Sequence, residues 1–377
     1  MEGCKRIGIL TSGGDAPGMN AAIRAATLVG TAAGAEMFGI ERGYRGLLED
    51  AMARLTPADV TGILREGGTV LGSARCKEFH QREVRDKARA VLAARGIDGL
   101  VVIGGNGSLT GAMHLANPEE IGSGPPLRFI GIPASIDNDL GLTSLSIGVD
   151  TAMNTIVEAC DKIADTATAH DRTFIVEVMG RDCGYLAMTS AIAVGADLAL
   201  FPEAGKPDRA VVDQIVETVL AVRNRVDTTA RRRARRVIII KAEGVSIPID
   251  RLKTEVDARL RELAPDADPS GIETRVTVLG HVVRGGRPSA FDRLLGSRLA
   301  NVAVRALGVG ISHKMAAWMP PVELPEEVGT RSPADPYCWL VDMAAVLAET
   351  DNLLAGRSSL ARWRAGAFDQ IEDALLL

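Results

Sequence analysis

The chain has 377 residues, and at roughly 150 residues per domain this length predicts two or three domains. Apolar residues make up 46% of the chain and charged residues 24%, a composition that excludes a mainly disordered protein. The formal net charge of −5 gives no support to nucleic acid as the main partner. The five cysteines show no paired spacing, so we expect no structural zinc site. We also expect a cytoplasmic protein, because the sequence has no apolar run long enough to span a membrane and no signal peptide.

Short apolar runs alternate with helical patterns along most of the chain. Strands are predicted at residues 5–11, 98–103, 128–132, 172–178, 197–201 and 236–241, and helices at 19–31, 151–167 and 208–225. Strands that alternate with helices are typical of parallel sheets covered on both faces. Thr56, Pro57 and Asp59 resemble a helix-capping box with proline at the first helical position.

The chain changes in character after about Ala317. Residues 320–336 are rich in proline and acidic side chains and predict a surface loop. Two helices are expected after it, and the apolar residues assigned to them are Trp339, Met343, Val346, Trp363, Phe368 and Ile371. Before the strand at 236–241, the basic run Arg231–Arg236 is interpreted as a solvated turn, with polyanion binding as the alternative.

Glycine- or aspartate-rich segments follow three of the predicted strands: TSGGDAPGMN at 11–20, GGNGS at 104–108 and PASIDND at 133–139. Ligands of parallel α/β sheets bind beyond the carboxyl ends of the strands. Glycines let a phosphate approach the backbone, and the free N–H groups at a helix start attract it. The first segment is not a Walker loop, because no GK[ST] follows it. An ordinary turn remains the alternative for each segment.

Polar side chains in and near these segments suit phosphate chemistry. A carboxylate such as Asp137 or Asp139 can take a proton from a substrate hydroxyl, while the other holds magnesium or orients the first. The amide of Asn106 offers a neutral oxygen to magnesium. Arginine forks match phosphate oxygens, although any single arginine is more often a solvated surface group. The five candidates are Arg75, Arg172, Arg181, Arg275 and Arg284.

Taken together, long segments between about residues 5 and 315 resemble the ATP-dependent 6-phosphofructokinases of bacterial type. The matching segments are ILTSGGDAPGMNAAIRA, GTVLGSAR, VVIGGNGS, GIPASIDND, VEVMGR, ETRVTVLGHVVRGG and FDRLLGSRLA. The resemblance implies two Rossmann-like three-layer α/β/α domains with mainly parallel sheets and the active site in the cleft between them. The expected nucleotide-binding domain covers 1–141 plus about 283–330. The expected sugar-phosphate domain covers about 142–282 plus about 331–377.

The resemblance also implies an activity: transfer of a phosphoryl group from ATP to the 1-hydroxyl of D-fructose 6-phosphate, with Mg²⁺, in glycolysis. Asp137 matches the family's general base and Asp139 its second carboxylate, while Ser135 stands where the family usually has threonine. Gly14 and Arg181 match further catalytic positions. The nucleotide-contacting positions are Gly14, Tyr44, Arg75, Cys76, Gly105, Asn106, Gly107 and Ser108. The sugar-phosphate positions are Ser135, Asp137, Met179, Gly180, Arg181, Glu243, His281 and Arg284.

Arg172 and Arg275 match arginines that reach the sugar phosphate from a neighbouring subunit. The resemblance therefore implies a homo-oligomer, usually a tetramer, with a dimer as the alternative. Other expected partners are small-molecule substrates only, with no nucleic acid and no membrane. The family's effector site contains basic residues where this chain has Leu28, Pro57 and Ala164, so weak or absent regulation at that site is expected.

Several positions depart from the family pattern. Asn106 replaces a magnesium-associated aspartate, which predicts weaker magnesium binding. Cys76 and His80 replace an aromatic residue and an arginine near the nucleotide, so the preferred nucleotide stays open. Gly107 and Ala134 are small where pyrophosphate-using relatives carry aspartate and lysine, which favours ATP as the donor.

Three alternatives remain at this point. The same chemistry could act on another ketose phosphate, such as sedoheptulose 7-phosphate, or could use another donor. A non-catalytic homologue that binds nucleotide and regulates a partner is a third. Retention of Asp137, Asp139 and Arg181 argues against that third alternative, because a binding protein has no chemical need for the base.

Overall fold

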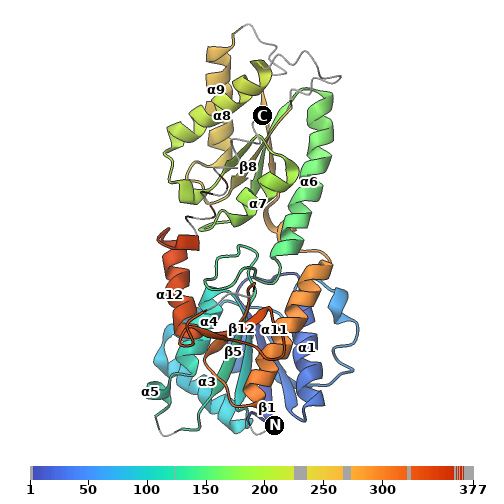
Figure 1. Ribbon diagram of the computed structural model, residues 1–377, viewed down its shortest axis with the longest axis vertical. Helices are drawn as coiled ribbons and strands as arrows, with labels where there is room; N and C mark the ends of the chain where they lie inside the picture. Colours follow the sequence, from blue (N-terminus) through green and yellow to red (C-terminus); the bar gives the residue numbers. More distant parts are fainter. Residues whose placement is uncertain are drawn as a thin grey trace. The chain divides into compact units, whose positions relative to one another are not determined.

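The computed structural model describes residues 3–122, 124–224, 236–265, 273–320 and 324–360, together with 362, 364, 366 and 368. The chain divides into two compact units (Figure 1). The first comprises Met1–Thr151 and Arg284–Leu353, and the second Ala152–Val283 and Leu354–Leu377. No helix in the described part of the chain is long and apolar enough to cross a membrane. Most of the basic run (231–235), Trp363 and Ile371 lie outside the described residues.

Within the described residues, the first unit forms an eight-stranded sheet in the order β11-β12-β10-β5-β4-β1-β2-β3. The strands β10, β5, β4, β1 and β2 run parallel, whereas β3, β12 and β11 pair antiparallel. The strands are β1 (Arg6–Ser12), β2 (Glu36–Ile40), β3 (Met52–Leu55), β4 (Gly99–Gly104), β5 (Arg128–Pro133), β10 (Lys314–Trp318), β11 (Gly329–Arg331) and β12 (Cys338–Asp342).

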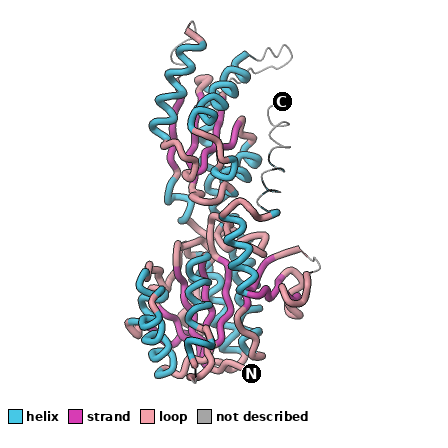
Figure 2. Tube along the Cα trace, turned by 90° about the vertical axis from the view of Figure 1, so that its left-hand side faces the viewer, coloured by secondary structure: helices cyan, strands magenta, loops and turns pink. Residues whose placement is uncertain are grey.

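Helices of the first unit cover both faces of this sheet (Figure 2). They are α1 (Met19–Ala32), α2 (Gly43–Leu48), α3 (Arg82–Ala94), α4 (Asn106–Leu115), α5 (Pro118–Ile121), α11 (Ala290–Gly308) and α12 (Met343–Leu354), with short 3₁₀ turns η1 (Ile63–Arg65) and η2 (Lys77–His80). Helices α1 and α11 pack against each other. Strand residues such as Leu100, Val102 and Phe129 are fully buried with Leu109 of α4, which explains why these strands are continuously apolar.

In the second unit, the described residues form a four-stranded parallel sheet in the order β7-β8-β6-β9. Its strands are β6 (Thr173–Val178), β7 (Leu198–Leu200), β8 (Val237–Ala242) and β9 (Thr274–Val278). Its helices are α6 (Val149–Ala169), which begins in the first unit, α7 (Tyr185–Val194), α8 (Asp208–Asn224) and α9 (Ile249–Leu263). Its 3₁₀ turns are η3 (Pro202–Ala204) and η4 (Gly280–Arg284), whose last residue, Arg284, belongs to the first unit. Helices α8 and α9 pack together over the sheet (Figure 1). Their apolar faces enclose Ile175 and Ile239.

Every predicted strand and helix with stated bounds is confirmed to within two residues at each end: 5–11, 19–31, 98–103, 128–132, 151–167, 172–178, 197–201, 208–225 and 236–241. The helix expected at Thr56 is wrong. Asp59 does accept hydrogen bonds from the backbone N–H and the hydroxyl of Thr56, at 2.8 and 2.6 Å, but residues 57–60 form a turn. Gly62, with φ of 94°, follows shortly and disfavours a continuing helix.

Two expectations for the C-terminal part are also wrong. Trp339 lies in strand β12 and not in a helix, because residues 338–342 pair with β10. The segment 320–336 is not entirely loop, because it contains β11, which pairs with β12. These pairings place residues 331–353 in the first unit, whereas we expected them in the second.

Candidate active site

The loop after β1 brings a glycine pair and an arginine together. Gly13 has a φ of 88°, and Gly18, just before α1, has a φ of 109°, so both need the conformational freedom of glycine. The guanidinium of Arg284 lies over this loop: it donates a hydrogen bond to the carbonyl of Asp15 at 3.4 Å. A Cβ added to Gly14 would lie only 2.7 Å from the Arg284 guanidinium. Two predicted phosphate contacts, Gly14 and Arg284, are therefore neighbours.

The loop after β4 leads directly into α4. Asn106, Gly107 and Ser108 form the first turn of this helix, after Gly105 at its N-cap. The first N–H groups of a helix have no intrahelical partner and favour an anion. A Cβ added to Gly107 would meet no atom within 4 Å, so the space in front of this turn is open. A Cβ added to Gly104 would lie 2.4 Å from the Ser12 carbonyl oxygen, so the ends of β4 and β1, from which the two loops start, are in close contact.

The loop after β5 carries the predicted carboxylates. The Ala134 N–H donates to the Gly104 carbonyl at 3.0 Å, which ties this loop to the start of α4. The Ser135 hydroxyl donates to Asp139 Oδ1 at 2.7 Å. Asp137 lies between them and is half-buried, and its Oδ1 atom is buried. The predicted serine and two carboxylates thus lie on one short loop beside the helix terminus.

Asn138 holds this loop in shape, a role that the sequence analysis missed. It is fully buried, and its φ of 51° is a left-handed conformation that asparagine tolerates better than most residues. Its amide donates to the Ser144 carbonyl and accepts from the Ser146 N–H, both at 3.0 Å. The Asp-Asn-Asp order itself was the available signal, because asparagine between two carboxylates favours such a turn.

The segment that carries Arg75 is fixed to the same loops. The Ser73 hydroxyl donates to the Gly13 carbonyl at 2.5 Å. The buried amide of Asn20, also missed by the sequence analysis, donates to the carbonyls of Glu66 and Gly67 and accepts from the Val70 N–H. The side chain of Arg75 itself is exposed at this edge of the first unit.

Tyr44 lies beneath the first turn of α4. It is only 4% exposed, donates to the Ser108 carbonyl at 2.6 Å and stacks on Phe79 with ring centroids 4.2 Å apart. Burial raises the pKa of its phenol above the ordinary value. Cys76 packs against the same core, and burial, followed by the nearby Glu78 carboxylate, raises the pKa of its thiol. The structure thus makes Tyr44 a support for the α4 terminus.

In the second unit, predicted sugar-phosphate residues follow the carboxyl ends of three strands. Met179, Gly180 and Arg181 come after β6, Glu243 after β8, and His281 after β9. The Glu243 N–H donates to the Val178 carbonyl at 2.9 Å, which joins the first two groups. The Arg181, Glu243 and His281 side chains are exposed, whereas Met179 is buried.

Arg172 and Arg275 lie near the amino ends of the strands, away from the carboxyl ends that carry the residues above. Arg172 immediately precedes β6, and Arg275 is the second residue of β9, where it faces Phe174 across the β6–β9 pair. Arg275 forms an ion pair with Glu273 at 2.7 Å. At about 3.3 Å per strand residue, the six-residue β6 separates Arg172 from Arg181 by roughly 20 Å or more. Within one copy of the unit, Arg172 and Arg275 are therefore too far from Arg181 to contact the same phosphate group.

The oxygen ligands on the first unit fit magnesium shared with substrate phosphates. In the described part of the chain, no three or more His, Cys, Asp or Glu side chains group to hold a metal ion alone. Mg²⁺ is usually held by one or two carboxylates together with phosphates and water. Asn106, which accepts a long 3.4 Å hydrogen bond from Thr110, and the carboxylates of Asp137 and Asp139 are such hard oxygen ligands.

Comparisons with known proteins agree with this architecture. The family model described as Phosphofructokinase matches residues 6–307. The chain is 46% identical over 311 residues to an ATP-dependent 6-phosphofructokinase of Clostridium botulinum, covering 82% of this chain and 88% of the relative. It is 44% identical over 314 residues to the corresponding protein of Thermotoga neapolitana, covering 83% and 89%.

Among solved structures, phosphofructokinase from Saccharomyces cerevisiae superposes with a TM-score of 0.79 at 32% identity. The match covers 97% of this chain but only 50% of the yeast chain, so the present chain spans half the length of that relative. The matched family model covers most of the chain, including every loop described above. The chain therefore belongs to the phosphofructokinase family.

Proposed function

We propose that this protein is an ATP-dependent 6-phosphofructokinase, which transfers the terminal phosphoryl group of ATP to the 1-hydroxyl of D-fructose 6-phosphate and releases ADP and fructose 1,6-bisphosphate. The observation that carries the proposal is the 3.0 Å hydrogen bond from Ala134 to Gly104. This bond holds the loop with Asp137 against the helix start that suits a phosphate. A general base and an anion site are adjacent, as transfer to a hydroxyl requires.

The chain's contribution to the reaction is positioning and charge neutralisation. N–H groups at the start of α4 and the Gly13–Gly14 loop hold the nucleotide phosphates. The guanidinium of Arg284, which the resemblance assigns to the sugar phosphate, lies beside the Gly13–Gly14 loop and neutralises charge there. Asp137 accepts the proton of the sugar's 1-hydroxyl, and Asp139 orients Ser135 through their 2.7 Å hydrogen bond. Mg²⁺, held by Asn106 and Asp139 together with phosphates, would supply further neutralisation when bound.

ATP as the donor is supported by two small residues. The open space around Gly107 accommodates the inner phosphates of a nucleotide. Ala134 is only 1% exposed, so a lysine there would have no room without displacing its neighbours. Both observations disfavour pyrophosphate, which would need charge in place of the missing part of the nucleotide.

The second unit supplies the sugar-phosphate contacts in this proposal, through Arg181, Glu243 and His281. Arg172 and Arg275 then act on the site of a second copy of the chain, because the length of β6 keeps them away from Arg181. Exposed apolar residues beside the β9 edge support such an association: Val278 is 55% exposed and Val282 67%. A homo-oligomer, with a tetramer as the proposed form, follows.

A cytoplasmic location is part of the same proposal. Cys4, Cys76, Cys160 and Cys338 form no disulfide in the structure. Thiols in this state are usual in reducing compartments.

The direct test uses purified protein, Mg²⁺, fructose 6-phosphate and either ATP or pyrophosphate, with sedoheptulose 7-phosphate as a second acceptor. We expect ATP-dependent formation of the bisphosphate, reduced roughly 10²- to 10⁴-fold in Asp137→Asn. The matched control is Asp161→Asn, which changes an exposed carboxylate on α6 and should leave the rate unchanged. Equal turnover by Asp137→Asn and the wild type would refute the assignment of the base.

Sharing of sites between copies is tested by mixing two variants. Asp137→Asn and Arg275→Ala should each be nearly inactive alone. After co-refolding or co-expression, hybrid dimers contain one intact site, so roughly a quarter of wild-type activity should return. No recovery in hybrids that are shown to form would exclude the arrangement.

A further inference from the structure

A buried ion pair joins the two central strands of the second unit. Lys241 of β8 is 1% exposed, and its Nζ donates to Glu177 Oε2 at 2.7 Å and to the Ala242 carbonyl at 3.2 Å. Glu177 of β6 has a side chain that is only 15% exposed. The two residues are direct partners in the parallel ladder. Neither belongs to the site residues identified so far.

The pair lies where both strands give way to the sugar-phosphate loops. Glu177 is two residues before Met179, and Lys241 is two residues before Glu243. The Glu177 carbonyl accepts from the Leu279 N–H at 3.0 Å, which attaches the segment leading to His281. The ion pair therefore joins the strand ends below the first two groups of predicted sugar contacts, and the backbone of Glu177 joins the third.

The loops above the pair touch each other closely. The Gly244 N–H donates to the Gly180 carbonyl at 3.1 Å. A Cβ added to Gly244 would lie 1.9 Å from the Arg181 carbonyl oxygen, so only glycine fits here. Any change in the spacing of β6 and β8 is therefore passed directly to the backbone of Arg181 and Glu243.

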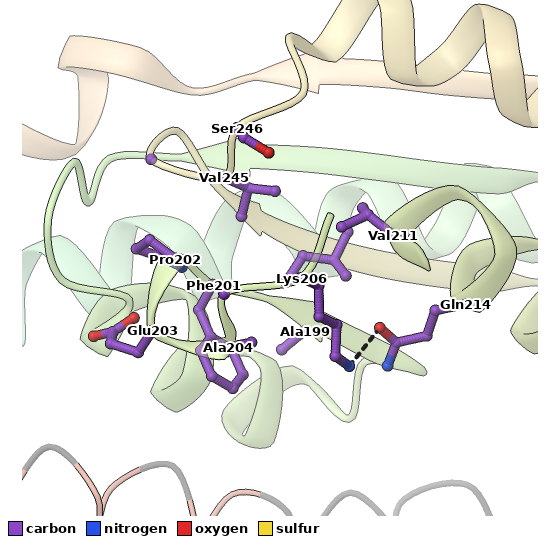
Figure 3. A pocket seen from close by; sticks show the side chains of 13 residues that line it. Ala199, Phe201, Pro202, Glu203, Ala204, Lys206, Val211, Gln214, Val245 and Ser246 are labelled. Atoms are coloured by element: carbon purple, nitrogen blue, oxygen red, sulfur yellow. Dashed lines mark hydrogen bonds between the residues drawn. The ribbon is translucent and has the colours of Figure 1, made fainter. Parts of the chain in front are cut away.

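The β8 loop borders a cavity on the side away from β6. Gly244, Val245 and Ser246 line a cavity of about 540 Å³ together with Phe201 and Lys206 (Figure 3). The Lys206 Nζ donates a hydrogen bond to Gln214 Oε1 at 2.8 Å, so the Lys206 side chain points toward Gln214 and not toward the loop. On that side the loop is held by Val245, which is buried in the apolar core, and by the Ser246 hydroxyl, which donates to Asp208 Oδ1 at 2.6 Å. The link from Lys241 to Glu177 is the restraint that joins the strand just before Glu243 to β6.

A buried ion pair is a poor source of net stability, because the desolvation of both charges offsets their attraction. An apolar pair of similar size would fill the same space at least as well. What the charged pair adds is a directional link of fixed length between the strands.

We propose that Lys241 and Glu177 are positioning residues for the acceptor sugar: their ion pair sets the spacing between Arg181 and Glu243. The inference rests on the proposed function of those two residues. It requires no direct contact between Lys241 and the substrate.

Steady-state kinetics of three variants test this proposal. Lys241→Met removes the cation while preserving much of the side-chain length, and Glu177→Gln is the milder change. A loop displacement of about 1 Å can cost up to 10²-fold, so we expect the KM for fructose 6-phosphate to rise roughly 10- to 100-fold in Lys241→Met and less in Glu177→Gln. The KM for ATP should stay within about twofold, because the nucleotide loops lie in the first unit.

The third variant, Lys241→Met with Glu177→Leu, separates positioning from stability. It replaces the ion pair with an uncharged, apolar pair and leaves no unpaired buried charge, so its thermal midpoint should return close to the wild-type value. The fructose 6-phosphate KM should remain raised. Recovery of both the midpoint and the KM would show a merely structural role and overturn the proposal, as would an unchanged KM in a folded Lys241→Met or Glu177→Gln.

The matched control is Lys162→Met, which breaks the ion pair with Glu158 on α6 in the same unit. Both partners are more than 70% exposed, so neither the KM nor the midpoint should change. Failure of the proposed function can be told apart from failure of this inference. If the wild-type protein neither turns over fructose 6-phosphate nor binds it in calorimetry, the proposed function itself is wrong, and this is known before any variant is compared.

Discussion

Glu120 offers a quantitative test of the electrostatics of the first unit. Its carboxylate accepts hydrogen bonds from Arg85 at 2.5 and 3.0 Å and from Arg89 at 2.6 Å. The hydrogen bonds from Arg85, followed by the one from Arg89, lower the pKa of Glu120 from 4.5 to about 2. Arg85 also donates to the carbonyls of Phe79 and His80, so the carboxylate indirectly supports the turn that stacks on Tyr44.

The stabilisation follows from the two pKa values. At about 1.4 kcal/mol per pKa unit, the charged carboxylate contributes up to about 3 kcal/mol at neutral pH. Because the folded-state pKa lies below the unfolded one, this contribution is fully present above about pH 4.5 and is lost as the pH falls toward 2. The Glu120 side chain is 16% exposed, so solvent screening makes this an upper bound.

The perturbation is Glu120→Gln, which keeps the shape and removes the charge. Urea unfolding followed by tryptophan fluorescence should show a loss of about 2–3 kcal/mol at pH 7 and less than half of that at pH 3. The control is Glu119→Gln, an exposed neighbour in the same turn. A loss of the same size at both pH values would refute the reasoning, because the destabilisation would then not depend on the carboxylate charge.

Three further predictions concern the site. Gly107→Asp should fold normally, because an added Cβ meets no atom within 4 Å, yet should lose most ATP-dependent turnover in a coupled assay; retained turnover would contradict the open phosphate site. Asn106→Asp should lower the Mg²⁺ concentration needed for half-maximal rate, and an unchanged magnesium titration would count against the assigned ligand. Asn138→Ala should lower the free energy of unfolding by about 1–3 kcal/mol and reduce kcat. Asn138→Gly should lose less stability in thermal unfolding, because glycine tolerates the φ of 51°. Equal losses of stability in the two variants would argue against backbone strain at this position.

The three site loops of the first unit could be predicted because each follows a strand with a continuous apolar run. Gly104 ends such a strand, and the buried run before it fixes where the chain leaves the sheet. Parallel strands then bring the ends of β1, β4 and β5 to one edge, so Gly14, Asn106 and Asp137 gather without any sequence proximity.

Features that depend on distant pairing were not predictable in the same way. Trp339, Met343 and Val346 have helical spacing, but Trp339 joins β10, which lies about twenty residues earlier. The burial of Tyr44 depends on α4, since Gly111 leaves the room that its ring occupies. Local periodicity carries no information on either contact.

The edges of the first unit's sheet bear on how the protein behaves at high concentration. On one side the sheet ends in β11, which is three residues long, and Arg331 within it lies over the Trp339 ring at 5.3 Å. On the other side it ends in the four-residue β3, where Arg54 is paired with Glu36. Short edges that carry arginine offer few unpaired backbone groups to another sheet. Aggregation by strand addition is thereby discouraged at this sheet, even though its five central strands are among the most apolar segments of the chain.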